Sequence, residues 1–241
     1  MLTPKQYEFF LQEGYLLVPD LFSTSQLSAV LEAAEENAYG KSFSEFNAEM
    51  KANPDLEDEL SLPAGGLGFG GPRAQFCDIS TGAESIDRVL EHGPSLDSLE
   101  QLLDTPDIHH HHGYVYVRNG RIDRRGPTKP ETEFHLDWAK PLIPPHPDWQ
   151  RYGHVQAWVF LDDIDADCAP VRLIPRTHNK MGEVLRVIED DGYGFGDIRK
   201  VPQFQKPVTI TGKTGTVFFY SSHTPHAAQP FADKDRQRAV I

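Results

Sequence analysis

The sequence predicts N-terminal helices packed on one side of a double-sheet β barrel, a mainly β fold with flanking helices. Up to about residue 103, apolar residues recur mostly at helical spacing. From about residue 112 onward, short runs rich in β-branched and aromatic residues are separated by turns containing Pro, Gly, Asn and Asp. There is no internal repeat and no convincing linker, so residues 1–241 are expected to form a single domain.

The first helix is expected to begin after Thr3, with Pro4 at its first position, and to end at Gly14. The further N-terminal elements expected are a strand at 15–18, a helix after the serine-rich turn 23–25, and an interrupted helical stretch at 85–103. Residues 40–75 are polar and then glycine-rich without a clear period, and they are expected to form a loop that could cover a site.

Four later segments are expected to be strands, namely 112–117, 154–161, 170–175 and 215–220. The last residues, 238–241, read as the start of another strand. Either the protein ends inside its sheet or the chain is a truncated copy of a longer one, and we expect truncation at the C-terminus.

The composition argues against several classes of function. The 241 residues are 39% hydrophobic, and 36 acidic against 23 basic residues give a net charge of −13, which argues against nucleic acid or an anionic membrane as a partner. Apolar runs are too short to span a membrane. The first residues lack a basic leader followed by an apolar stretch, and Cys77 and Cys168 lack metal-type spacing, so a cytoplasmic protein with reduced thiols is expected.

The most informative motif is His135-Leu136-Asp137, followed far downstream by His226. Residues i and i+2 of a strand point to the same face, so His135 and Asp137 can reach one metal ion together. Two histidines and one carboxylate are the ligand set of non-haem Fe(II) oxygenases. His223 is the nearest competitor of His226, but its spacing turns it to the other face of a strand. Taken alone, His135 or His226 would more often be a hydrogen-bonded core histidine than a metal ligand.

Other polar residues have two interpretations each. The run 109–112 contains four histidines, which cannot all face one ion and are expected to form a polar strand entrance. Arg118 and Lys129 could contact a carboxylate or phosphate of a substrate, with exposed, solvated charges as the default. His178 is expected to cap a turn, and 189–197 to be a solvated loop or a lid with glycine hinges.

The order of several segments resembles that of the phytanoyl-CoA dioxygenase family of Fe(II)/2-oxoglutarate-dependent oxygenases. The resemblance covers nearly the whole chain. The segments that carry it are the amphipathic opening 2–19, the H-x-D motif 135–137, Gln-Ala-Trp-Val-Phe-Leu-Asp-Asp at 156–163, Leu-Ile-Pro-Arg-Thr-His at 173–178, and 215–220 running on to His226 and a downstream arginine.

This resemblance implies a double-stranded β-helix (a jelly-roll, cupin-like barrel), an Fe(II) ion held by His135, Asp137 and His226, and 2-oxoglutarate as cosubstrate. Family members bind the distal carboxylate of 2-oxoglutarate with an arginine about ten residues after the distal histidine. Arg236 and Arg238 both fall there, and Arg238, which precedes an Ala-Val-Ile run, is favoured. Trp158 matches a position beside the cosubstrate.

The chain also departs from the family pattern. Ala227 and Ala228 follow the distal histidine where the family often has Gly-Ser, so a hydroxyl contact to the cosubstrate is absent. Phe231 stands where an Asn is common, and Arg176 replaces the usual glycine of Ile-Pro-Gly-Ser-His. These departures leave the metal ligands intact and put the detail of the cosubstrate pocket in doubt.

The reaction implied is hydroxylation of a small organic substrate by O2, with decarboxylation of 2-oxoglutarate to succinate. Related halogenases have a small residue in place of the carboxylate ligand, so Asp137 predicts hydroxylation. Two alternatives remain: a cupin-like jelly-roll protein that binds metal without oxidising anything, and an inactive family member. No strongly basic cluster suggests the phosphates of coenzyme A, and the sequence indicates no particular substrate.

Overall fold

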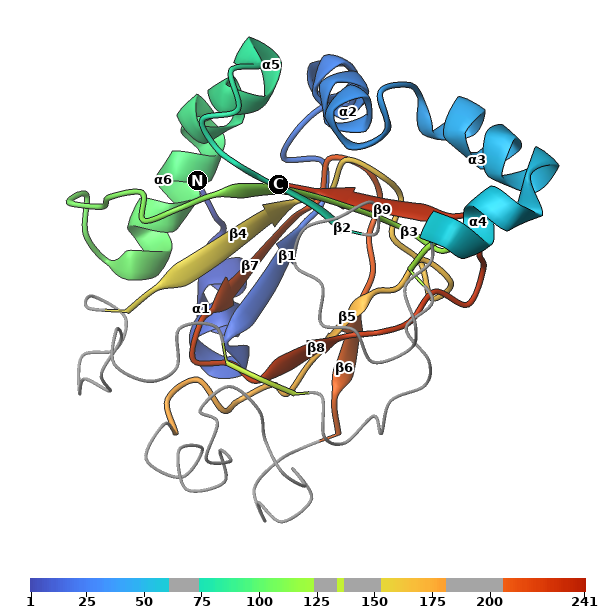
Figure 1. Ribbon diagram of the computed structural model, residues 1–241. Coiled ribbons are helices and arrows are strands. Elements are labelled where there is room, and N and C mark those ends of the chain that lie inside the picture. Colours follow the sequence, from blue (N-terminus) through green and yellow to red (C-terminus); the bar gives the residue numbers. More distant parts are fainter. Residues whose placement is uncertain (61–73, 124–133, 137–152, 181–205) are drawn as a thin grey trace.

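The computed structural model describes residues 1–60, 74–123, 134–136, 153–180 and 206–241 (Figure 1). Its helices are α1 (Pro4–Glu13), α2 (Thr24–Tyr39), α3 (Phe43–Ala52), α4 (Pro54–Leu60), α5 (Glu84–Asp87), the 3-10 helix η1 (Arg88–Glu91) and α6 (Gly93–Leu103). Its strands are β1 (Tyr15–Val18), β2 (Ala74–Asp78), β3 (Tyr114–Asn119), β4 (Val155–Val159), β5 (Val171–Leu173), β6 (Val208–Ile210), β7 (Val217–Ser221), β8 (His226–Ala228) and β9 (Gln237–Val240).

The first helix begins and ends where the sequence predicts, and the second begins at the predicted serine-rich turn. Thr3 and Gln6 form a reciprocal capping box at the start of α1, and Gly14 ends the helix in the left-handed conformation at φ +80°. Ser23 and Gln26 form the same box at the start of α2. The interrupted helical stretch is also confirmed, since α5 and η1 precede α6, which begins at Gly93.

The expectation of a loop from 40 to 75 is wrong for its first half, which holds α3 and α4. Ser42 caps α3 by a capping box with Glu45, and Phe46 and Met50, one helical turn apart, are buried against Ile122. Together with the other helices, these two make the described chain mixed α and β, and the expectation of a mainly β protein is corrected accordingly. Residues 61–73 lie outside the described part.

Two layers of antiparallel strands lie beneath helices α2 to α6 in Figure 1, and α1 lies lower, beside β1. In the first, β7 lies between β1 and β4, and β3 lies between β2 and β9. Main-chain hydrogen bonds between Val159 and Ile241 (2.7 and 3.2 Å) and from Leu161 to Ala239 (3.0 Å) join these two groups into one layer, called the first sheet below. The second sheet has the order β6-β5-β8.

The four predicted strands are confirmed within a few residues as β3, β4, β5 and β7, and the strand expected near the last residues is β9. Three short strands were not predicted: β2, β6 and β8. Strands as short as β6 and β8 span too few residues for an alternating pattern to stand out from the flanking turns.

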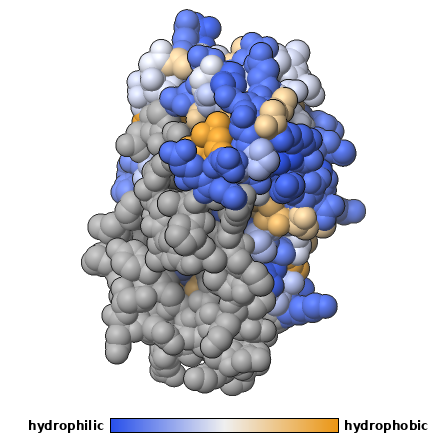
Figure 2. Space-filling model, turned by 45° about the vertical axis from the view of Figure 1, so that its right-hand side comes forward, coloured by the Kyte–Doolittle hydropathy of each residue, from blue (hydrophilic) through white to orange (hydrophobic). Residues whose placement is uncertain are grey.

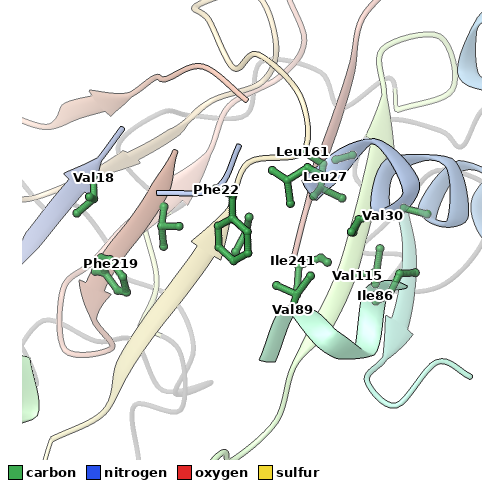
Figure 3. Packing of buried hydrophobic residues seen from close by; sticks show 14 of the residues in the cluster. Val18, Phe22, Leu27, Val30, Ile86, Val89, Val115, Leu161, Phe219 and Ile241 are labelled. Carbon is green, nitrogen blue, oxygen red and sulfur yellow. The ribbon is translucent and has the colours of Figure 1, made fainter. Parts of the chain in front are cut away.

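One face of the first sheet packs against the helices. Its side chains include Val115, Val117, Ala239 and Phe219, and they form a single apolar cluster with residues from α2, α5 and α6 (Figure 3). The opposite face of the first sheet meets the second sheet through another cluster. Its buried members are Phe160, Ile164, Val171, Leu173, Ile210, Phe218, Tyr220 and Val240, with Tyr116 and Trp158 packed against them. The space between these side chains of the two sheets is called the inter-sheet space below.

The described part of the face drawn in Figure 2 is mostly hydrophilic, with small, separate hydrophobic areas. Among the described residues, the exposed large hydrophobic side chains are Met1, Phe9 and Leu96. None of the helices that the structure describes is long and apolar enough to cross a membrane.

Candidate metal and cosubstrate site

The two histidines of the predicted triad lie side by side. His226 opens β8, and His135 forms an antiparallel bridge with it, exchanging two main-chain hydrogen bonds of 2.9 and 3.0 Å. Directly opposed residues of an antiparallel pair project to the same side of the sheet. The two imidazole rings accordingly lie 4.5 Å apart between centroids, with 53° between their planes.

Both histidines face the inter-sheet space. Leu173 of β5 is the Cα partner of His226 and belongs to the apolar cluster between the sheets. His226 is the cross-strand partner of Leu173, and His135 is the cross-strand partner of His226. All three side chains therefore lie on the inter-sheet face. Tyr220 of the first sheet meets His226 from the other side, with its ring centroid 5.1 Å from the imidazole.

The ring of His226 is oriented by its own turn. Nδ1 lies 3.1 Å from the main-chain oxygen of Thr224, an acceptor only, so Nδ1 carries the proton and donates it. This tautomer leaves Nε2 unprotonated, the form in which an imidazole nitrogen binds a metal. A metal-binding histidine is commonly held in this way by a hydrogen bond from its other ring nitrogen.

Asp137 lies outside the described residues. Within the described part of the chain, no group of three His, Cys, Asp or Glu side chains is arranged to hold a metal ion. The structure brings His135 and His226 together, and the third ligand, Asp137, stays a prediction from the sequence. Two adjacent histidines are part of the donor set that suits Fe(II).

His223, the competitor of His226, lies in the turn between β7 and β8 and is buried. Its main-chain N–H donates to Ser221 Oγ at 3.3 Å. The turn that carries it packs on Gly14, whose main-chain oxygen accepts from the Ser221 N–H at 3.0 Å. His226, in contrast, forms the bridge with His135.

The two candidate arginines are in different environments. Arg238, on β9, is buried, and its guanidinium lies 5.5 Å from the ring centroid of Tyr116 and 5.7 Å from that of Trp158. It donates through Nη1 to the main-chain oxygen of Ala169. Tyr116 and Trp158 belong to the inter-sheet cluster, so Arg238 extends into the same space as the two histidines.

Arg236 precedes β9 and pairs with Asp165 at 2.7 Å on the outside of the molecule. Its Nη2 also donates to the main-chain oxygen of Asp163 at 3.1 Å. Of the two arginines, only Arg238 therefore extends into the inter-sheet space.

Aromatic rings connect the histidine pair with Arg238. Trp158 is edge-on to Tyr220, with ring centroids 6.0 Å apart, and Tyr220 is edge-on to His226. Trp158 therefore lies beside Arg238 on one side and one ring away from His226 on the other. These rings supply an apolar wall in which a charged group of a ligand would be shielded from water.

The remaining histidines are placed as follows. Residues 109–112 precede β3 and are exposed or half-buried, consistent with a polar approach to that strand. His178 does more than cap a turn: it is buried against Gly14, and its Nε2 is 3.2 Å from the main-chain oxygen of Leu11. Burial lowers its pKa to about 4, so the imidazole is neutral in the folded protein near neutral pH. Lys129 and 189–197 lie outside the described residues.

The default interpretation of Arg118 as an exposed charge is wrong. Arg118 is fully buried, and its Nε donates to Asp123, also buried, at 2.5 Å. The residue lies on β3, which has β2 on one side and β9 on the other, so it has no free edge. A signal was present in the sequence, because Arg118 continues the alternation that places Tyr116 on the inter-sheet face.

Comparisons with known proteins agree with this fold. Three similar solved structures, each less than a fifth identical in sequence, share the fold. SnoK, a non-haem alpha ketoglutarate dependent carbocyclase from nogalamycin biosynthesis, has a TM-score of 0.64 at 17% identity, covering 99% of this chain and 81% of its own. EctD from S. alaskensis, solved with 2-oxoglutarate and 5-hydroxyectoine, has a TM-score of 0.63 at 18% identity, covering 99% and 74%.

HygX from Streptomyces hygroscopicus, solved with nickel and 2-oxoglutarate, has a TM-score of 0.59 at 14% identity, covering 100% of this chain and 85% of its own. No curated protein sequence matches the chain significantly. The model of the phytanoyl-CoA dioxygenase (PhyH) family matches residues 72–239. The chain belongs to this family, and the resemblance noted in its sequence is confirmed.

Proposed function

We propose that the protein is an Fe(II)- and 2-oxoglutarate-dependent oxygenase that hydroxylates a small organic substrate with O2. The observation that carries the proposal is the common orientation of His135, His226 and Arg238 into one inter-sheet space. We propose further that the two sheets close around this space as a double-stranded β-helix. Family membership and the similar fold of oxygenases solved with 2-oxoglutarate support it.

In this proposal His135, Asp137 and His226 hold the metal. When bound, Fe(II) supplies the activation of O2 that no protein side chain provides. The role of the chain is to present three ligands on one side and leave the other positions open. The hydrogen bond from His226 Nδ1 to Thr224 fixes the ring so that Nε2 keeps its direction while ligands exchange.

Arg238 is proposed to bind the distal carboxylate of 2-oxoglutarate. A guanidinium matches a carboxylate by two parallel N–H···O hydrogen bonds, and burial strengthens the attraction because water does not screen it. Trp158 and Tyr116 cover the guanidinium on the inter-sheet side and exclude solvent from it. Arg236 takes no part, because Asp165 already holds it at the surface.

The test is to mix anaerobic protein with Fe(II) and 2-oxoglutarate and record the weak visible charge-transfer band that their joint coordination produces. The proposal predicts a band that disappears in His135→Ala and in Asp137→Ala. His92→Gln is the matched control, because His92 stacks on Phe22 in the helix-facing cluster. A folded, metal-loaded protein without a band would favour metal binding without oxygenase activity.

A further inference from the structure

Arg118 is a second buried cation on the inter-sheet face. It is the Cα partner of Arg238 across β3 and β9, so the two side chains leave the first sheet on the same side, at adjacent positions. Val117 and Ala239, the next residues along each strand, turn to the helix-facing cluster instead. The two arginines therefore enter the inter-sheet space together.

The Arg118 guanidinium lies against an aromatic ring of the turn that follows β8. Its central carbon lies 5.3 Å from the ring centroid of Phe231, which follows β8 by three residues. Phe231 is half-buried and follows the two alanines after His226, so the guanidinium lies beside the segment that leaves β8.

The hydrogen-bonding capacity of Arg118 is only partly used. Asp123 accepts from Nε, and the part of the chain that the structure describes offers no hydrogen-bond partner to Nη1 or Nη2, both of which are buried. Buried donors are nearly always paired, because leaving them unpaired forfeits the hydrogen bonds they would make with water. Two donors fixed side by side on one edge of a planar guanidinium fit the two oxygens of a carboxylate.

We propose that Arg118 is a carboxylate-binding residue of the inter-sheet site, acting beside Arg238 through Nη1 and Nη2. This inference rests on the proposed function only for the identity of the carboxylate. The carboxylate belongs either to 2-oxoglutarate, whose distal group Arg118 and Arg238 would then share, or to an acidic substrate bound next to it. Asp123 fixes the orientation of the guanidinium by holding Nε.

Removing Arg118 alone would take away the ion-pair partner that holds the buried Asp123 and could unfold the protein. The test therefore uses the double variant Arg118→Gln/Asp123→Asn, which replaces the ion pair by two neutral amides. The matched control is Arg236→Gln/Asp165→Asn, which removes the surface ion pair close to β9. Thermal unfolding of both variants establishes that they are folded before binding is measured.

Two probes are titrated by calorimetry in the presence of Mn(II), so no turnover is required. The first is 2-oxoglutarate, and the second is acetate added to protein already saturated with 2-oxoglutarate. We expect the inner double variant to bind one of the probes at least about tenfold more weakly than the wild type, and the surface double variant to bind both unchanged. Weaker binding of 2-oxoglutarate identifies the cosubstrate as the source, and weaker binding of acetate alone identifies an acidic substrate.

A folded inner variant that binds both probes as the wild type does would overturn the inference and leave Arg118–Asp123 as a structural ion pair. Failure of the proposed function gives a different result. In that case the wild type binds no 2-oxoglutarate, and acetate is titrated into the Mn(II)-loaded protein without it. Acetate binding that depends on Arg118 would then support the inference alone, and binding that does not would overturn it.

Discussion

The two faces of the first sheet differ in chemistry although the same strands form both. The helix-facing side of β3, β7 and β9 carries Val115, Val117, Phe219 and Ala239, packed into one apolar cluster. The inter-sheet side of the same strands carries Tyr116, Arg118, Tyr220 and Arg238. Both faces therefore bury apolar side chains, and the inter-sheet face adds two buried guanidinium groups.

The largest effect is expected on the inter-sheet side, from removal of the distal histidine, His226. We expect His226→Ala to lose metal binding by at least about a hundredfold while the protein stays folded, because the alanine keeps the main-chain bridge to His135. His223→Ala is the control and should retain metal affinity. Calorimetric titration with Mn(II) measures both, and equal losses in the two variants would contradict the assignment of His226.

The corresponding variant on the helix-facing side is Phe219→Ala, which should affect stability and not binding. Phe219 is fully buried, so its truncation should lower the free energy of unfolding by about 3–5 kcal/mol. The folded fraction should still bind 2-oxoglutarate with wild-type affinity, since the side chain points away from the inter-sheet space. Phe9→Ala, at a side chain 40% exposed, should cost less than about 1 kcal/mol in the same urea titration.

The third prediction concerns the turn between α1 and β1. A Cβ at Gly14 would lie 2.3 Å from Nδ1 of the buried His178, and the residue has φ +80°. Gly14→Ala should therefore destabilise the protein by about 2–4 kcal/mol through backbone strain and overpacking. Gly40→Ala has a similar φ of +67° with nothing within 4 Å of the added Cβ, so it should show only the strain, about 1–2 kcal/mol. Equal costs in chemical denaturation would argue against the His178 contact.

The last prediction is a pH dependence on the helix-facing side. Burial, and then repulsion by Glu35, raises the pKa of Asp162 to about 7. A carboxyl whose pKa is higher in the folded than in the unfolded state binds its proton more tightly when folded. Its contribution to stability is therefore present below pH 4 and is lost as pH rises toward 7.

Asp162→Asn removes this ionisation. The free energy of unfolding of this variant, relative to that of the wild type, should increase between pH 4 and 7. The increase should be at most about 1.4 kcal/mol for each unit by which the pKa of Asp162 differs between the folded and unfolded states, and it should level off above pH 7. Urea denaturation at pH 4, 5.5, 7 and 8 measures the difference. A constant difference across this range would show that Asp162 titrates normally.

The sequence predicted those parts of the fold whose signals are local. Capping boxes and terminal glycines define α1 and α2 within a few residues, and the same kind of box at Ser42 and Glu45 would have identified α3. That helix lies in the loop expected from 40 to 75 because the glycine-rich stretch after residue 60 leaves the segment as a whole without a helical period.

The site was only partly predictable because the burial and the partners of its residues depend on segments that are far away in the sequence. Arg236 and Arg238 are two residues apart, so strand alternation gives them the same face and cannot separate them. The separation comes from the start of β9 at Gln237, which leaves Arg236 in the preceding turn with Asp165. Arg118 was misjudged because its burial depends on both neighbouring strands, β2 and β9, which lie far from it in sequence.

The central claim, that orientation into the inter-sheet space selects the ligand-binding residues, is tested most directly by the dissociation constant of 2-oxoglutarate. It is measured by calorimetry with Mn(II) for Arg238→Gln and Arg236→Gln, after thermal unfolding has shown that both are folded. We predict binding at least about tenfold weaker for Arg238→Gln and within about twofold of the wild type for Arg236→Gln. Unchanged binding in Arg238→Gln, or a loss confined to Arg236→Gln, would contradict the claim.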